Sequence, residues 1–119
     1  MTKFFKGFRY AFAGIAHAIK GQLNIKIHLL VAALVTALGF YFRVTSTEWC
    51  VLILTITLVL SLELVNTAIE NLVDLVSPNQ HSLAGKIKDI AAGAVLIAAM
   101  SAAIIGIIIF YKYVYPSIE

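Results

Sequence analysis

The hydrophobic and polar positions of the chain follow a helical period near the amino terminus and form long apolar runs afterwards. Over about 3–20, apolar residues recur on one side of a helix, at Phe4, Phe8, Phe12, Ile15 and Ile19. Basic residues occupy the opposite side, at Lys3, Lys6, Arg9 and Lys20. This pattern predicts an amphipathic helix that lies in a membrane surface with its aromatic face in the acyl boundary. A helix packed on a soluble core is the alternative.

Three apolar stretches follow, and they predict membrane-spanning helices over about 24–42, 48–76 and 89–111. The turn between the first two is short and polar, and Thr47 is a candidate N-cap for the next helix. A polar connection is expected from Asn79 to Asp89. The chain is therefore predicted to be a single all-α membrane domain over 1–119, with a surface helix and three transmembrane helices.

The last stretch also carries small residues four apart, at Ala94, Ala98, Ala102 and Gly106. Such a series allows another helix to approach closely. Alanine that simply fills a helix is an equally good interpretation.

Composition strengthens the membrane prediction. Hydrophobic residues make up 61% of the chain and charged residues only 13%, whereas a soluble domain is about half apolar and a quarter charged. Disorder is excluded, and an ordinary soluble fold is disfavoured. A single cysteine, Cys50, excludes an internal disulfide. Most of the nine basic residues precede residue 29 or lie in 77–89, which predicts that the amino terminus and this connection are cytoplasmic.

Acidic and amide side chains form one stripe on the second predicted membrane helix, at Glu63, Asn66, Glu70 and Asp74. An ionisable side chain in a membrane helix costs several kcal/mol unless it is paired or faces a polar cavity. The stripe is therefore expected to face a cavity, a cation or basic partners. Lys86 and Lys88 are candidates for the partners.

This set of residue types suits phosphoryl transfer. Carboxylates bind Mg²⁺ together with phosphate oxygens, a positioned glutamate can accept a proton from a hydroxyl, and lysines neutralise phosphate charge. The same residues would suit a cation- or proton-coupled carrier, and the pattern alone does not separate the two. The general nucleotide motifs GxxxxGKS/T and GxGxxG and the protein-kinase HRD and DFG signatures are absent from the sequence.

Two longer runs resemble a known family. The run from Glu63 to Asp74, ELVNTAIENLVD, and the run from His81 to Asp89, HSLAGKIKD, resemble motifs of the prokaryotic diacylglycerol kinase family, which includes the undecaprenol kinases. The resemblance implies a homotrimeric kinase with active sites between neighbouring subunits, in the bacterial inner membrane. It also implies that ATP and Mg²⁺ are used to phosphorylate a lipid alcohol at the cytoplasmic face.

The resemblance further implies roles for single residues. Glu63 matches the catalytic base, Glu70 matches a metal-binding glutamate, and Asn66 matches the polar residue beside them. The positions that match residues near or in contact with the nucleotide in the family are Tyr10, Gly14, His81, Lys88 and Asp89. Gln22 stands where the family has a second metal-binding or ATP-contacting glutamate, and its amide oxygen can ligate a cation but carries no charge.

The sequence leaves alternatives open for both the lipid substrate and the activity. Asn71, Leu75 and the run from Asn24 to His28 resemble the undecaprenol kinases more than the diacylglycerol enzyme of enteric bacteria. Undecaprenol is therefore the narrow preference and diacylglycerol the alternative. Gln22 also leaves open a family member that is catalytically inactive.

Overall fold

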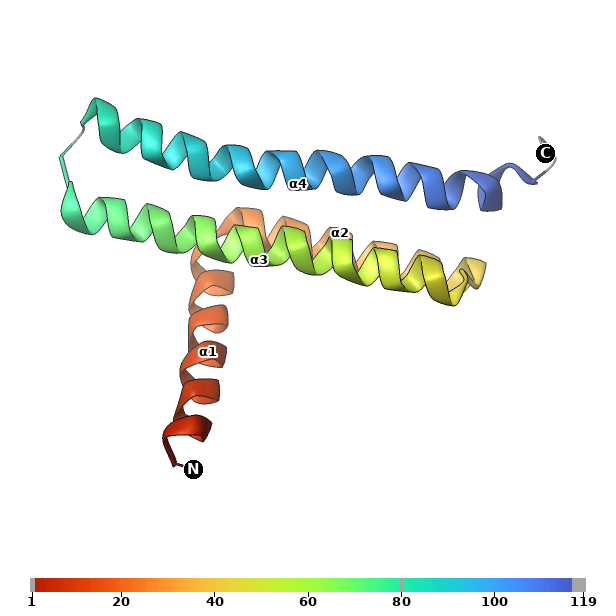
Figure 1. The fold of residues 1–119 in the computed structure, drawn as a ribbon, viewed down its shortest axis with the longest axis horizontal. Helices are drawn as coiled ribbons and strands as arrows, with labels where there is room; N and C mark the ends of the chain where they lie inside the picture. Colours follow the sequence, from red (N-terminus) through yellow and green to blue (C-terminus); the bar gives the residue numbers. More distant parts are fainter. Residues whose placement is uncertain (1, 80, 117–119) are drawn as a thin grey trace.

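The computed structural model describes residues 2–79 and 81–116, which form four α-helices (Figure 1). They are α1 (Thr2–Gly21), α2 (Leu23–Phe42), α3 (Ser46–Val76) and α4 (Ser82–Val114). The last three are each long and apolar enough to cross a membrane. The expected all-helical class with three membrane-length helices is confirmed.

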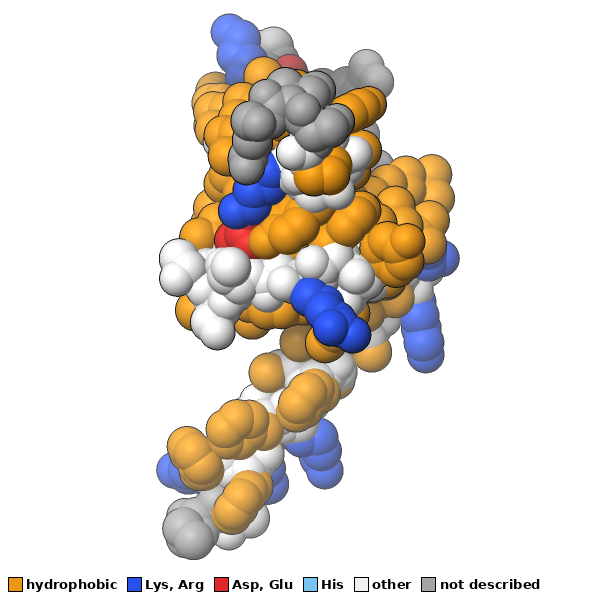
Figure 2. All heavy atoms as spheres, turned by 90° about the vertical axis from the view of Figure 1, so that its right-hand side faces the viewer, with side chains coloured by type: hydrophobic (Ala, Val, Ile, Leu, Met, Phe, Trp, Pro, Cys, Tyr) orange, Lys and Arg blue, Asp and Glu red, His pale blue; other side chains and the backbone are white. Residues whose placement is uncertain are grey.

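Helix α3 holds the bundle together. Both α2 and α4 pack along it, while α1 points away across the direction of the three long helices (Figure 1). Hydrophobic side chains cover most of the surface seen in Figure 2, both on the bundle and along α1. Few residues of α2 and α4 are buried, so these helices present apolar surface of the kind that lipid or another subunit covers.

The turn between α2 and α3 is stabilised by a capping box. Arg43 adopts the left-handed conformation, with φ 53° and ψ 54°, and ends α2. Thr45 then accepts a hydrogen bond from the Glu48 backbone, while its own N–H donates to Glu48 Oε1 at 2.9 Å. The expected cap at Thr47 is wrong, because Thr45 has the extended backbone of an N-cap and stands three residues before a glutamate.

The same end of the bundle is closed by contacts between all three long helices, which we call the aromatic seam. The ring of Phe42 on α2 lies 6.0 Å from that of Phe110 and 5.7 Å from that of Tyr113, measured between centroids. Glu48 on α3 accepts a hydrogen bond from the Tyr113 hydroxyl and pairs with Lys112 Nζ at 2.8 Å. The seam consists of these five residues.

The connection at the other end is shorter than the sequence suggested. Helix α4 begins at Ser82, and His81 caps it by accepting a hydrogen bond from the Leu83 N–H at 3.1 Å. The expected polar connection as far as Asp89 is therefore wrong. Polarity alone does not break a helix, and no glycine–proline signal interrupts this run. The charged residues up to Asp89 consequently project from the first turns of α4.

Gly39 tests the packing beside the seam. A Cβ at this position would lie 2.6 Å from Cη2 of Trp49, whose ring also packs 4.8 Å from that of Phe40. We expect Gly39→Ala to lower the free energy of unfolding by about 1–3 kcal/mol, measured by denaturant unfolding in detergent. The control is Gly93→Ala on α4, where an added Cβ meets nothing within 4 Å. Equal stability of the two variants would contradict this packing.

Candidate active site

The buried polar side chains among the described residues all belong to α3. They are Glu63, which is 2% exposed, and Asn66 and Thr67, each 5% exposed. Further along the same stripe Glu70 is half-buried and Asp74 is exposed. The stripe thus passes from a buried interior to the surface over about three helical turns.

Glu63 has a partner on the neighbouring helix. Its Oε2 lies 3.6 Å from Nε2 of His28 on α2. The Thr67 hydroxyl donates to the backbone oxygen of Glu63 at 3.0 Å and so leaves the carboxylate itself available. A buried carboxylate without a partner would be destabilising by several kcal/mol, and the imidazole of His28 supplies that partner. Spacing along the chain gives no signal for His28 as this partner, because only the pairing of α2 with α3 brings it to Glu63.

Asn66 and Glu70 follow Glu63 along the same face of α3. The Asn66 amide donates from Nδ2 to Glu70 Oε1 at 3.2 Å, whereas Asn66 Oδ1 is buried with no hydrogen-bond partner in the described structure. A buried acceptor left unsatisfied costs about 1–3 kcal/mol. This oxygen is therefore suited to a ligand, and together with the Glu70 carboxylate it is the hard-oxygen donor type that Mg²⁺ prefers.

The described part of one chain contains no group of three or more His, Cys, Asp or Glu residues that could hold a metal ion. Mg²⁺ typically uses one or two carboxylates and completes its coordination with phosphates and water. Glu70 supplies the carboxylate and Asn66 supplies one further oxygen for such a site. The remaining ligands would have to come from a bound phosphate, from water or from another subunit.

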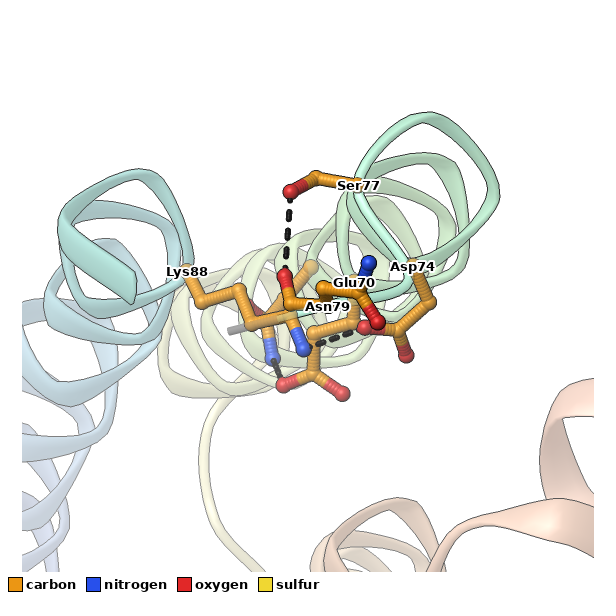
Figure 3. Close-up of polar contacts among 6 residues, drawn as sticks. Glu70, Asp74, Ser77, Asn79 and Lys88 are labelled. Atoms are coloured by element: carbon orange, nitrogen blue, oxygen red, sulfur yellow. Dashed lines mark hydrogen bonds and ion pairs between the residues drawn. The ribbon is translucent and has the colours of Figure 1, made fainter. Parts of the chain in front are cut away.

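A second, polar hollow lies where α3 ends and α4 begins. It has a volume of about 530 Å³, and its lining includes Asp74, Ser77, His81, Gly85 and Lys88. Lys88 reaches from α4 to Asp74 on α3, with 2.5 Å between Nζ and Oδ1 (Figure 3). The expected contact of Lys88 with the acidic stripe is confirmed. The amino terminus of α4 adds the partial positive charge of a helix dipole, which favours an anion at this hollow.

The remaining candidate residues, most of them near the amino terminus, lie apart from the ion pair of Lys88 and Asp74. Gly14 lines a hollow of about 310 Å³ between α1 and α3, together with Thr67 and Asn71. Tyr10 is 63% exposed on α1. Gln22 occupies the N-cap of α2 without a side-chain capping bond. Asp89 is exposed on α4. Hydrogen bonds and ion pairs of the described residues join Asn66 to Glu70 and Lys88 to Asp74. Glu63 lies on the same stripe, and His81 lines the same hollow as Lys88. None of these contacts reaches the other candidates.

Comparison with known proteins finds relatives over most of the chain. The profile of the family described as prokaryotic diacylglycerol kinase matches residues 9–110. The undecaprenol kinase of Bacillus subtilis (strain 168) is 41% identical over 110 residues, covering 92% of this chain and 89% of that protein. The diacylglycerol kinase of Synechocystis sp. is 45% identical over 100 residues, covering 83% of this chain and 57% of that protein.

A more distant relative is the diacylglycerol kinase of Escherichia coli (strain K12), 28% identical over 112 residues that cover 94% of this chain and 92% of that protein. The family match and the names of these relatives, together with three membrane-length helices, define a small helical lipid kinase. The chain belongs to the prokaryotic diacylglycerol kinase family, and the resemblance of its two motifs is confirmed.

The pairing of Glu63 with His28 predicts coupled effects on stability. We expect Glu63→Gln and His28→Ala to be non-additive, with a coupling energy of at least about 1 kcal/mol, measured as free energies of unfolding of the two single variants and the double variant. Glu63→Gln combined with His81→Ala is the control, because His81 caps the start of α4 and should add within about 0.5 kcal/mol. Additivity for His28 as well would show that the two side chains do not interact.

Proposed function

We propose that this protein is an ATP- and Mg²⁺-dependent kinase of a membrane lipid alcohol, with undecaprenol preferred narrowly over diacylglycerol. The observation that carries the proposal is Glu63, a carboxylate 2% exposed on a long apolar helix, next to an unsatisfied amide oxygen. The printed activities of the relatives, undecaprenol kinase and diacylglycerol kinase, support the class of reaction.

In the proposed reaction Glu63 is the general base. It accepts the proton of the lipid hydroxyl while the hydroxyl oxygen forms a bond to the γ-phosphorus of ATP. The bond from that phosphorus to the bridging oxygen breaks, and ADP leaves. His28 holds the carboxylate toward α2, which orients it without occupying both of its oxygens.

The nucleotide is proposed to lie at the amino terminus of α4. Lys88 and His81 line the polar hollow there, and Asp89 follows on the same helix. Gly14 and Tyr10 on α1 are proposed for the nucleotide from the family resemblance. Lysine and the helix dipole together offset phosphate charge. The Asp74 carboxylate keeps Lys88 extended across the hollow until a phosphate competes for it.

Glu70 is proposed to hold Mg²⁺, with oxygens from Asn66 and Gln22. When bound, Mg²⁺ neutralises charge on the transferred phosphate. From the family resemblance we also propose a homotrimer in which neighbouring subunits complete each site. The exposed apolar surface of α2 and α4 is available for such contacts.

The proposed orientation has the amino terminus and the start of α4 in the cytoplasm of a bacterium, with the protein in the inner membrane. Basic residues concentrate in these two segments. Helix α1 exposes Phe4, Phe8 and Phe12 and is proposed to lie in the membrane surface. The Glu63 carboxylate then lies near the level of a lipid headgroup.

The first experiment measures ADP release by the purified protein in mixed micelles with ATP and Mg²⁺. We expect turnover that depends on a lipid alcohol and is higher with undecaprenol than with diacylglycerol. Glu63→Gln should lower turnover by about 100-fold or more while leaving the oligomeric mass unchanged. Full turnover in that variant would rule out the base; ATP-independent cation uptake into vesicles, without lipid phosphorylation, would favour a carrier.

Gln22 motivates the second alternative, an inactive family member, and gives a separate prediction. Because its side chain makes no capping bond, it can be changed without removing a helix cap. We expect Gln22→Glu to lower the Mg²⁺ concentration for half-maximal turnover by several-fold, since a charged carboxylate binds the cation more strongly. Gln22→Met should raise it. A higher Mg²⁺ requirement in Gln22→Glu would place this residue away from the metal, and activity that appears only in Gln22→Glu would identify the native chain as inactive.

A further inference from the structure

An ion pair links α3 to α4 at the polar hollow, and both of its partners line that hollow. Lys88 extends from α4 toward the Asp74 carboxylate on α3, and its Nζ lies 2.5 Å from Oδ1 (Figure 3). Lys86 lies two residues earlier, which turns it about 200° around α4, and it makes no ion pair within 2–79 and 81–116. Lys88 is therefore the lysine that the hollow receives, and Asp74 already neutralises its charge.

The exposure of this ion pair makes it weak. The side chains of Asp74 and Lys88 are 63% and 37% exposed, and an exposed ion pair adds little to stability because water competes for both charges. The packing of α4 along α3 comes from apolar side chains further along the helix, including Ala91, Val95 and Ala98, which are buried. The ion pair can therefore open without loosening the two helices.

The ion pair at the aromatic seam is built differently. The Glu48 side chain is 13% exposed and pairs with Lys112. It also accepts hydrogen bonds from the Tyr113 hydroxyl and from the backbone of the preceding turn, so several donors fix one shielded carboxylate. Asp74, by contrast, has Lys88 as its one side-chain partner in the part of the chain that the structure describes. Of the two ion pairs, the one at the hollow is suited to exchange.

Other polar groups of the hollow are already used locally. The Ser77 hydroxyl donates to a backbone oxygen of the connection at 3.2 Å, and His81 Nδ1 accepts a backbone N–H from the first turn of α4 at 3.1 Å. An anion that enters the hollow therefore relies on Lys88 for a positively charged side chain. A phosphate that shared the ammonium with Asp74 would lie about 4–5 Å from the carboxylate, where like charges repel. Replacement of the carboxylate by the phosphate avoids this repulsion.

We propose that Asp74 is an autoinhibitory residue of the nucleotide site: its carboxylate occupies Lys88 in the nucleotide-free protein, and a phosphate replaces it there when a nucleotide binds. The inference rests on the proposed function, which places the nucleotide at this hollow. Asp74 then lowers the affinity for both ATP and ADP, because each nucleotide must displace the same carboxylate. Its return to Lys88 as the phosphate leaves favours the release of ADP.

Nucleotide binding in the absence of lipid, where no transfer to a lipid occurs, tests the competition. Asp74→Asn keeps the size of the side chain and removes its charge. We expect it to lower the Kd for ATP and for ADP by about two- to fivefold, the factor that an exposed ion pair is worth. Asp74→Glu, which restores a carboxylate, should return the Kd toward that of wild type. Isothermal titration calorimetry in detergent at a fixed Mg²⁺ concentration measures all three proteins.

Chemical labelling reports the ion pair itself. The purified protein is treated with the N-hydroxysuccinimide ester of acetic acid, and acetylation of each lysine is followed by peptide mass spectrometry. We expect Lys88 in the nucleotide-free wild type to react several-fold more slowly than Lys86, and Asp74→Asn to remove that difference. ATP should protect Lys88 in both proteins. Lys86 is the internal control, because it is exposed on the same helix and lies outside the hollow.

A higher Kd for ATP in Asp74→Asn would overturn the inference, because Asp74 would then position Lys88 for the phosphate. An unchanged Kd would overturn it as well. With faster Lys88 labelling, it would mean that the ion pair forms but does not compete with the nucleotide; with unchanged labelling, that the ion pair does not form in solution. Failure of the proposed function looks different: ATP would protect Lys88 in neither protein, and lipid-dependent ADP release would be absent from the wild type.

Discussion

A carboxylate placed within a long apolar helix is the constraint on which this structure depends. Glu63 is almost fully buried, and such a group is tolerated only where other helices bring it partners. Helix α2 brings His28, and α4 packs closely on the same helix through residues such as Ala98, which is 6% exposed. The central position of α3 follows from this requirement, because both neighbours must reach its polar turns.

The two ends of the bundle carry different kinds of contact. At the aromatic seam, stacked rings, a capping box and an ion pair around Glu48 fix the three helices to one another. At the other end the polar side chains are only partly satisfied: Asn66 Oδ1 has no partner among the described residues, and Lys88 pairs with a carboxylate that is exposed. Unsatisfied groups of this kind cluster where a protein binds ligands, whereas the seam serves stability.

Sequence reasoning reached the helical class and the membrane-length helices because hydropathy over 20 or so residues decides them directly. It also identified the stripe from Glu63 to Asp74, since spacing along one helix determines which residues share a face. It could not find the partnership of Glu63 with His28, because that contact arises from how separate helices pack. It misplaced the cap at Thr47 and the start of α4 because local polarity is a weak guide to where a helix begins.

The aromatic seam has a mechanical consequence. Three long helices that are joined firmly at one end tilt about that end. Since α3 is about 46 Å long by the helical rise, a tilt of about 5° at the seam moves its far end by about 4 Å. Small changes in ring packing around Phe42 are thereby magnified along the helix, and at Glu63, about 26 Å from the start of α3, the same tilt gives a displacement of about 2 Å. Side chains remote from every ligand can in this way set the width of the space in which Glu63 lies.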